Sequence, residues 1–283
     1  MDTIQLNHGI TMPQQGLGVF QVTDQSVCKE SVLTALQTGY RLIDTAACYG
    51  NERAVGEAVR ESGIAREELF LTSKVWIQDA GYAKTREAFE RSCANLGVSY
   101  IDIYLIHQPY NDYYGSWRAM EELYDEGRIK VIGVCNFSAE RLVDLWMNSR
   151  IQPMLDQVEF HPLFAQKELN DVLAMYPCQL EAWGPLNEGQ RDIFHHPELI
   201  KIAAKYDRTV AQIVLRWHMQ HDVIAIPKTV DPQRMKENMA IFDFRLDEAD
   251  MAAIDALDIG YSEIIDHQSY MTAKWLNKYK IHD

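Results

Sequence analysis

The sequence predicts an α/β fold, a single (β/α)8 TIM barrel with an N-terminal β-hairpin and a C-terminal extra helix and tail. Three observations carry this prediction. Short apolar runs alternate with helical segments eight times along the chain. Runs such as IYLI and VIAI are apolar throughout, as the strands of a parallel sheet are when helices cover both of its faces. The eight units occupy about 250 residues, the usual size of such a barrel, and no linker interrupts them.

Length, charge and cysteine content agree with one large domain over residues 1–283. Of the 283 residues 47% are hydrophobic, enough to bury a large core. The formal net charge of −14 argues against general binding to nucleic acid or to anionic membranes, since both attract basic surfaces. The five scattered cysteines form no CxxC pair, and neither a signal-peptide pattern nor a bilayer-spanning apolar run is present. We therefore expect a cytoplasmic protein with reduced thiols.

The first half of the chain contains the hairpin and four strand–helix units. Alternating segments around Asn7-His8-Gly9 within residues 3–15 predict the hairpin. The next four strands are expected at 17–20, 41–44, 69–75 and 100–107, followed by helices from about Ser26, after Asn51, and near 85–96 and 114–126. A glycine stands where each of these helices should end, because glycine takes up the left-handed capping conformation easily. These glycines are Gly39, Gly63, Gly97 and Gly127.

Four further units and the C-terminal segment complete the pattern. Strands are expected at 129–134, 154–160, 178–183 and 223–227. Their helices are expected after Ser138, at 166–174, at 197–205 with 209–220, and from Asp231-Pro232. A last helix at 247–257 precedes a polar and aromatic tail at 261–283.

Four reactive side chains lie at the ends of consecutive predicted strands. Asp44, Lys74 and His107 end strands two, three and four, and Tyr49 follows strand two. The carboxyl ends of neighbouring barrel strands meet on one face, so these side chains should lie together. A nearby ammonium would lower the phenol pKa from its usual value near 10, and Asp44 would keep Lys74 charged. Tyr49 would then protonate a carbonyl oxygen to which His107 donates a hydrogen bond.

Each of these residues also has an ordinary structural interpretation. Asp44 and Lys74 would form a buried ion pair, and His107 would be a satisfied core histidine. For any one of the four alone, we favour that interpretation. Their occurrence at successive strand ends favours the catalytic one.

A second cluster follows strand eight. Lys228 and Thr229 precede a helix that begins at Asp231-Pro232 and carries Arg234. Barrel phosphate sites form at the last loops, where free helix N–H groups and the helix dipole attract anions. The segment therefore predicts a phosphate ligand. A solvated helix face with an ordinary N-cap explains it equally well when it is taken alone.

Several long motifs resemble those of the aldo-keto reductases, and they occur in the same order from the hairpin to the final WLN. DTAACYGNE, LTSKVW and YLIHQP resemble the strand-two, lysine and histidine signatures of that family, whereas IKVIGVCNFS, QVEFHP, AWGPL and IPKTV…R…EN resemble its cofactor-side signatures. The bacterial branch of small-aldehyde and diketogluconate reductases is the most similar. The resemblance implies NADPH-dependent reduction of aldehydes and small ketones by a monomer.

The resemblance also assigns roles to individual residues. Tyr49 is implied as the proton donor, Lys74 as the residue that lowers its pKa, Asp44 as the partner of Lys74, and His107 as the residue that orients the carbonyl. Asn136 and Gln157 match the residues that hold the nicotinamide carboxamide, and Trp183 matches the aromatic residue that stacks on the nicotinamide ring. A clamp on the adenosine phosphate is matched by Lys228, Thr229 and Arg234, and contacts to adenine are matched by Glu237 and Asn238. Pro185 and Leu186 belong to the same implied cofactor site. The clamp implies NADPH rather than NADH, because only NADPH carries the 2′-phosphate.

The implied pocket for a small-molecule carbonyl substrate consists of Phe20, Trp76, His107, Gln108 and Tyr110, with residues of the tail. Four positions depart from the family pattern. Cys135 and Gly184 stand where serine is common, and Gln108 and Phe20 stand where tryptophan is frequent. These differences concern cofactor affinity and substrate preference, because none of them changes the four catalytic residues.

Two other functions stay open. A barrel lyase or aldolase would use Lys74 as a Schiff base, although Asp44 argues against it by keeping the amine charged. A regulatory protein would bind NADPH and turn over slowly.

Overall fold

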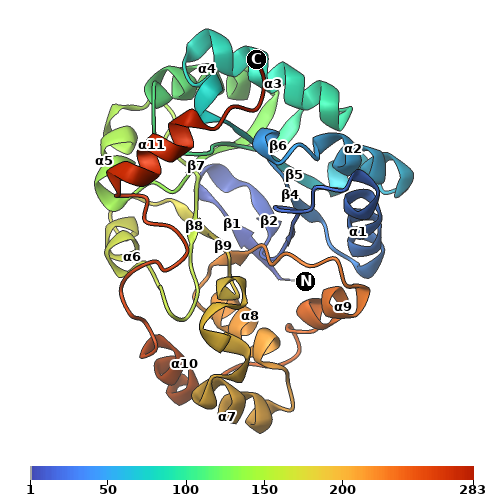
Figure 1. Ribbon diagram of the computed structural model, residues 1–283, viewed down its shortest axis with the longest axis vertical. Coiled ribbons are helices and arrows are strands. Elements are labelled where there is room, and N and C mark those ends of the chain that lie inside the picture. The colour runs from blue at the N-terminus through green and yellow to red at the C-terminus, as the bar shows by residue number, and fades with distance from the viewer. Residues whose placement is uncertain (1) are drawn as a thin grey trace.

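The computed structural model describes residues 2–283 and confirms the predicted barrel (Figure 1). Eight parallel strands form one curved sheet in chain order: β3 (Leu17–Gly18), β4 (Leu42–Asp44), β5 (Phe70–Val75), β6 (Ile101–Ile106), β7 (Ile129–Cys135), β8 (Leu155–Glu159), β9 (Gln179–Trp183) and β10 (Ile224–Ala225). Strands β5 and β6 are buried along almost their whole length, as their continuous apolar runs predict.

The first and last strands meet and close the barrel. Parallel bridges join Gln15 to Ala225 and Gly18 to Lys228. The amide of Gly16 donates to the Ala225 carbonyl over 2.9 Å. A Cβ at Gly16 would lie 2.6 Å from the Leu42 side chain and 2.9 Å from its carbonyl oxygen. Closure at this point therefore requires a glycine.

The predicted hairpin is present and covers the N-terminal end of the barrel. Strands β1 (Thr3–Gln5) and β2 (Thr11–Pro13) pair antiparallel. The Asn7 side chain in the turn donates to the carbonyls of Pro153 and Pro177 over 3.2 and 3.0 Å. Both prolines precede barrel strands, so the hairpin lies at the end opposite the strand carboxyl termini.

Helices surround the strands in Figure 1. They are α1 (Gln25–Thr38), α2 (Glu52–Glu61), α3 (Tyr82–Leu96), α4 (Tyr113–Asp125), α5 (Ala139–Asn148), α6 (Lys167–Leu173), α7 (Pro197–Tyr206), α8 (Val210–Gln220), α9 (Pro232–Met239), α10 (Glu248–Asp255) and α11 (Tyr270–Lys278). Their ends follow capping chemistry: the Asp24 carboxylate accepts from the Val27 amide over 2.9 Å, and Gly39 ends α1 with φ +109°. Among residues 2–283, no helix is both long enough and apolar enough to span a bilayer.

Helix α11 forms within residues 261–283, the segment that we expected as a polar and aromatic tail without naming a helix in it. Leu276 is its one buried residue, so the helix itself buries little apolar surface. Tertiary contacts hold the segment instead. The Trp76 indole donates to the Tyr279 carbonyl over 2.9 Å, and Gln78 Nε2 donates to the His282 carbonyl over 2.8 Å. The tail thus lies against the loop that follows β5, at the carboxyl end of the barrel.

Candidate active site

The four predicted catalytic residues meet at the carboxyl end of the barrel. Lys74 is completely buried, and its Nζ lies 2.6 Å from Asp44 Oδ1, 3.0 Å from the Thr45 carbonyl and 3.3 Å from the Tyr49 oxygen. An ammonium has three protons, and these three acceptors take all of them. Because the Tyr49 oxygen accepts from Lys74, the phenol proton is left to be donated elsewhere.

Burial changes the ionisation of this cluster. It raises the pKa of the Tyr49 phenol above its ordinary value, although the charge of Lys74 opposes the rise. Lys74 lowers the phenol pKa in the expected direction, but desolvation outweighs its charge, so the net shift of the phenol pKa is upward. Burial acts to lower the pKa of Lys74, but the charge of Asp44, followed by Tyr49 and the other neighbouring groups, together outweigh burial and raise the pKa above its ordinary value. The cluster holds a protonated phenol beside a permanently charged ammonium.

His107 completes the group as a neutral imidazole. Its ring lies edge-on to Tyr49 at 5.6 Å and to Trp76 at 5.2 Å between centroids. Burial, followed by the charge of Lys74, lowers its pKa well below the ordinary value. The Cys48 sulfur lies 3.4 Å from Nδ1. One ring nitrogen of a neutral imidazole carries a proton, so His107 can donate one hydrogen bond.

A cavity of about 1050 Å³ opens beside these residues. Its walls include Asp44, Tyr49 and His107, whereas Lys74 lies behind them. All the predicted cofactor residues line it: Asn136, Gln157, Trp183, Pro185, Leu186, Lys228, Thr229, Arg234, Glu237 and Asn238. Of the predicted substrate residues, Phe20, Trp76, His107 and Gln108 also line it.

Tyr110 is the exception among the predicted substrate residues. It is not part of the cavity wall. Its hydroxyl donates to the His267 carbonyl over 2.7 Å, and His267 itself lines the cavity. Tyr110 therefore anchors the tail through this hydrogen bond, and His267 forms part of the cavity wall in its place. The sequence places Tyr110 near the site but does not reveal which way its side chain points.

Asn136 and Gln157 lie side by side at the strand ends. Asn136 has a left-handed φ of +61°, which asparagine tolerates better than most residues. Its Nδ2 donates to the His107 carbonyl over 3.2 Å, and its Oδ1 accepts from Trp183 Nε1 over 2.8 Å. Gln157 Nε2 donates to Asp44 Oδ2 over 2.8 Å and to Glu181 Oε1 over 2.5 Å. Both amides are therefore oriented by the protein.

The basic end of the cavity differs in one respect from the expectation. The Asp231 carboxylate already accepts from the amides of Gln233 and Arg234 over 2.7 and 3.3 Å. Those helix N–H groups are therefore not free for an anion. Within residues 2–283, however, Lys228 and Arg234 have no carboxylate within salt-bridge distance although both are exposed. These two cations can hold a phosphate through their side chains.

The structure shows the surroundings of three of the four positions that depart from the family pattern. Gly184 has φ +57°, and a Cβ there would lie 3.7 Å from Ile264. Cys135 is buried with its sulfur 4.0 Å from Gln157 Oε1, and it does not line the cavity. Phe20 is 49% exposed at the rim, 4.9 Å from the Tyr49 ring.

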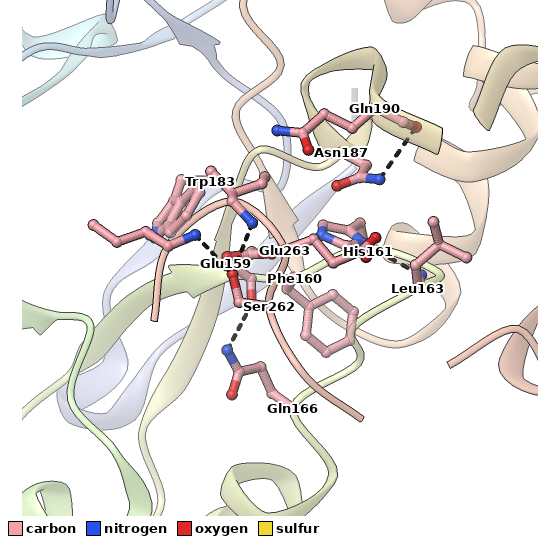
Figure 2. A network of polar contacts seen from close by, with 12 residues as sticks. Glu159, Phe160, His161, Leu163, Gln166, Trp183, Asn187, Gln190, Ser262 and Glu263 are labelled. Atoms are coloured by element: carbon pink, nitrogen blue, oxygen red, sulfur yellow. Dashed lines mark hydrogen bonds and ion pairs between the residues drawn. The ribbon is translucent and has the colours of Figure 1, made fainter. Parts of the chain in front are cut away.

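The tail forms walls of the cavity that the sequence did not specify residue by residue. These are Ile264, Ile265, His267, Thr272, Trp275, Leu276 and Tyr279. Figure 2 shows how the beginning of this segment is held: the Ser262 hydroxyl donates to Glu159 Oε2 over 2.5 Å, and the other oxygen of Glu159 lies 2.9 Å from His161 Nε2. Glu263 in the same segment pairs with Arg191. The tail is thereby fixed to the end of β8.

Glu181 is a second feature that the sequence analysis missed. It stands two residues before Trp183 in β9, so both side chains lie on the same face of the strand. Because Trp183 lines the cavity, this spacing could have placed Glu181 in the barrel interior.

Comparison with known proteins agrees with this geometry. The model of the aldo/keto reductase family matches residues 15–259. The chain belongs to this family. Glyoxal reductase of Bacillus subtilis is 50% identical over 258 residues, which are 91% of this chain and 93% of that protein. Methylglyoxal reductase DkgA of Escherichia coli is 42% identical over 260 residues, 91% of this chain and 94% of that protein.

Solved aldo-keto reductases share the fold. MGS-M4, an aldo-keto reductase from a deep-sea metagenome library, gives a TM-score of 0.91 at 41% identity and covers 94% of this chain and 98% of that one. A mutant of Gox0644 in complex with NADPH gives a TM-score of 0.86 at 39% identity, covering 91% of this chain and 93% of that one. The predicted family and branch are thus confirmed.

Proposed function

We propose that this aldo/keto reductase reduces small aldehydes and ketones to alcohols with NADPH, and that Tyr49 is the proton donor. The main support is the phenol of Tyr49, which accepts a hydrogen bond from a buried ammonium and lines the large cavity. The oxygen that accepts from Lys74 keeps its own proton available for a substrate. The named activities of the glyoxal and methylglyoxal reductases are consistent with this chemistry.

The chain offers a fitting site for the cofactor. A nicotinamide dinucleotide supplies a hydride to the carbonyl carbon when it is bound. Asn136 and Gln157 would hold its carboxamide, and Trp183 would lie against the ring. Lys228 and Arg234, exposed and without acidic partners in the described residues, would bind the 2′-phosphate of NADPH. The complex of the Gox0644 mutant with NADPH supports this assignment.

The residues of the chain then divide the proton chemistry among them. Tyr49 donates its proton to the carbonyl oxygen. Lys74 stabilises the phenolate that is left, because its ammonium lies 3.3 Å from that oxygen. Asp44 keeps Lys74 charged, and His107 orients the carbonyl through one hydrogen bond.

The substrate half of the cavity favours uncharged compounds. Its walls are aromatic and aliphatic, with polar groups at a few positions: Phe20, Trp76, Gln108, Ile264, Ile265, Trp275, Leu276 and Tyr279. None of these side chains is a cation that could pair with a substrate carboxylate. We therefore propose 2-oxoaldehydes and aromatic aldehydes as substrates, in preference to sugar acids.

The two alternatives have less support. A Schiff base requires a free amine, but Lys74 is buried, fully hydrogen-bonded and held charged by Asp44. A regulatory role without turnover does not explain a complete set of proton-transfer groups. Purified protein should consume NADPH with glyoxal and with benzaldehyde, and borohydride should trap no substrate adduct. NADPH binding without turnover across a carbonyl panel would instead support the regulatory role.

We also propose that the protein is a cytoplasmic monomer. All five cysteines are free thiols, which suits a reducing compartment. Light scattering on the eluting peak of a gel-filtration column should give the mass of one chain, 32.6 kDa. A dimeric mass would reject the monomer.

A further inference from the structure

Glu181 is a buried carboxyl group in the barrel, outside the set of four catalytic residues. It lies in β9 opposite Gln157 of β8 and has no exposed surface. Its Oε1 accepts a hydrogen bond from Gln157 Nε2 over 2.5 Å. The same nitrogen donates to Asp44 Oδ2 over 2.8 Å. The amino group of the Gln157 amide is therefore held between two carboxyl groups.

These contacts determine which way the Gln157 amide faces. An amide nitrogen donates and an amide oxygen accepts, so a flip would place the oxygen against the Asp44 carboxylate and would take the N–H donor away from Glu181 Oε1. The nitrogen therefore stays toward Asp44 and Glu181. The amide oxygen is left to accept hydrogen bonds from a ligand in the cavity that Gln157 lines. With one of the two acceptors removed, the amide could rotate about the remaining hydrogen bond.

Burying the Glu181 carboxyl group costs desolvation free energy that a residue with a packing role alone would not need to carry. Within residues 2–283, its Oε2 is buried without a hydrogen-bond partner, and no lysine or arginine pairs with the carboxyl group. An apolar side chain of similar size would occupy the same space without that desolvation cost. The hydrogen bond to Gln157 is the interaction that an apolar side chain could not provide.

We propose that Glu181 is a positioning residue that fixes the Gln157 amide for binding the nicotinamide carboxamide in one orientation. The proposal rests on the function proposed above, because it concerns the bound cofactor. With the Gln157 oxygen fixed, the site accepts the carboxamide NH2 group at one place. The nicotinamide ring is then held with one of its two faces toward the substrate. Without Glu181, the rotated amide also accepts the flipped ring.

Substitutions at Glu181 separate this role from simple packing. Glu181→Leu removes the acceptor, Glu181→Met is a second apolar variant in case the first does not fold, and Glu181→Gln keeps a carbonyl acceptor. Asp156→Asn is the matched control, because Asp156 is also a completely buried acid of this sheet but makes no hydrogen bond to Gln157. NADPH affinity is measured by quenching of tryptophan fluorescence. The face of hydride transfer is measured as deuterium in the alcohol product from (4R)- and (4S)-deuterated NADPH.

Wild type, Glu181→Gln and Asp156→Asn should transfer deuterium from only one of the two labelled cofactors. An apolar variant at Glu181 should bind NADPH roughly tenfold more weakly, the effect of one buried hydrogen bond, and should transfer deuterium from both. An apolar variant that keeps single-face transfer and an affinity within about twofold of wild type would overturn the role of Glu181. A wild-type protein that neither binds NADPH nor labels the product would overturn the proposed function instead.

Discussion

The ionisation of Glu181 should make the stability of this protein fall as pH rises through neutrality. Burial, followed by the charge of Asp44, raises the pKa of Glu181 from 4.5 to about 8. Between these values the unfolded chain has lost the proton of Glu181 while the folded chain keeps it. The unfolded state binds fewer protons, so the free energy of unfolding decreases across this window. Below about pH 4.5 both states are protonated and the penalty is absent.

The size of the penalty follows from the pKa difference. Each pKa unit corresponds to about 1.36 kcal/mol, so the full effect is on the order of 5 kcal/mol above pH 8. Glu181→Gln does not titrate and should escape it. Urea unfolding of both proteins at pH 5, 7 and 9 measures the effect. The stability of the variant relative to wild type should rise by several kcal/mol between pH 5 and pH 9. If the stability of Glu181→Gln relative to wild type stayed constant across these pH values, the claim that Glu181 is a buried neutral acid would be refuted.

Two further predictions concern the ends of the cavity. Arg234→Ala should weaken NADPH binding by roughly ten- to a hundredfold and NADH binding by much less, because the side chain is expected to contact the 2′-phosphate. The control is Lys236→Ala, which removes the same charge from the same helix but lies outside the cavity wall. If Arg234→Ala lost equal affinity for NADPH and NADH, the phosphate clamp would be rejected. A carboxylate on the substrate should raise KM at least about tenfold, since the walls of the substrate pocket contain no cation. Steady-state kinetics with benzaldehyde and with 4-carboxybenzaldehyde measure this difference in KM. Equal KM values for the two aldehydes would contradict the apolar pocket.

The parts of the fold and site that follow a strand end could be predicted from the sequence. Asp44, Lys74 and His107 lie where apolar runs stop, and parallel pairing in a barrel brings such positions to one face. Helix boundaries could also be predicted, because capping residues such as Gly39 and Asp231 act locally. Local rules therefore gave the barrel and the residues around its rim.

The features that were missed depend on contacts between distant segments. Helix α11 is held through hydrogen bonds that Trp76 and Gln78, about two hundred residues away, make to the residues just after it. The Tyr110 hydroxyl points to the His267 carbonyl, and the residues near Tyr110 in the sequence do not indicate this orientation. The net rise in the pKa of Tyr49 depends on how completely the folded chain excludes water from it.

Tyr49→Phe tests the central claim most directly, because it removes the donated proton and leaves the ring in place. The variant should bind NADPH as wild type does in the fluorescence titration, since the other residues of the cavity are unchanged. Its kcat with glyoxal should fall by roughly 10² to 10⁴, the usual contribution of a positioned general acid. Normal binding together with this loss is the result that the proton-donor role predicts. A variant that turns over glyoxal at the wild-type rate would contradict it.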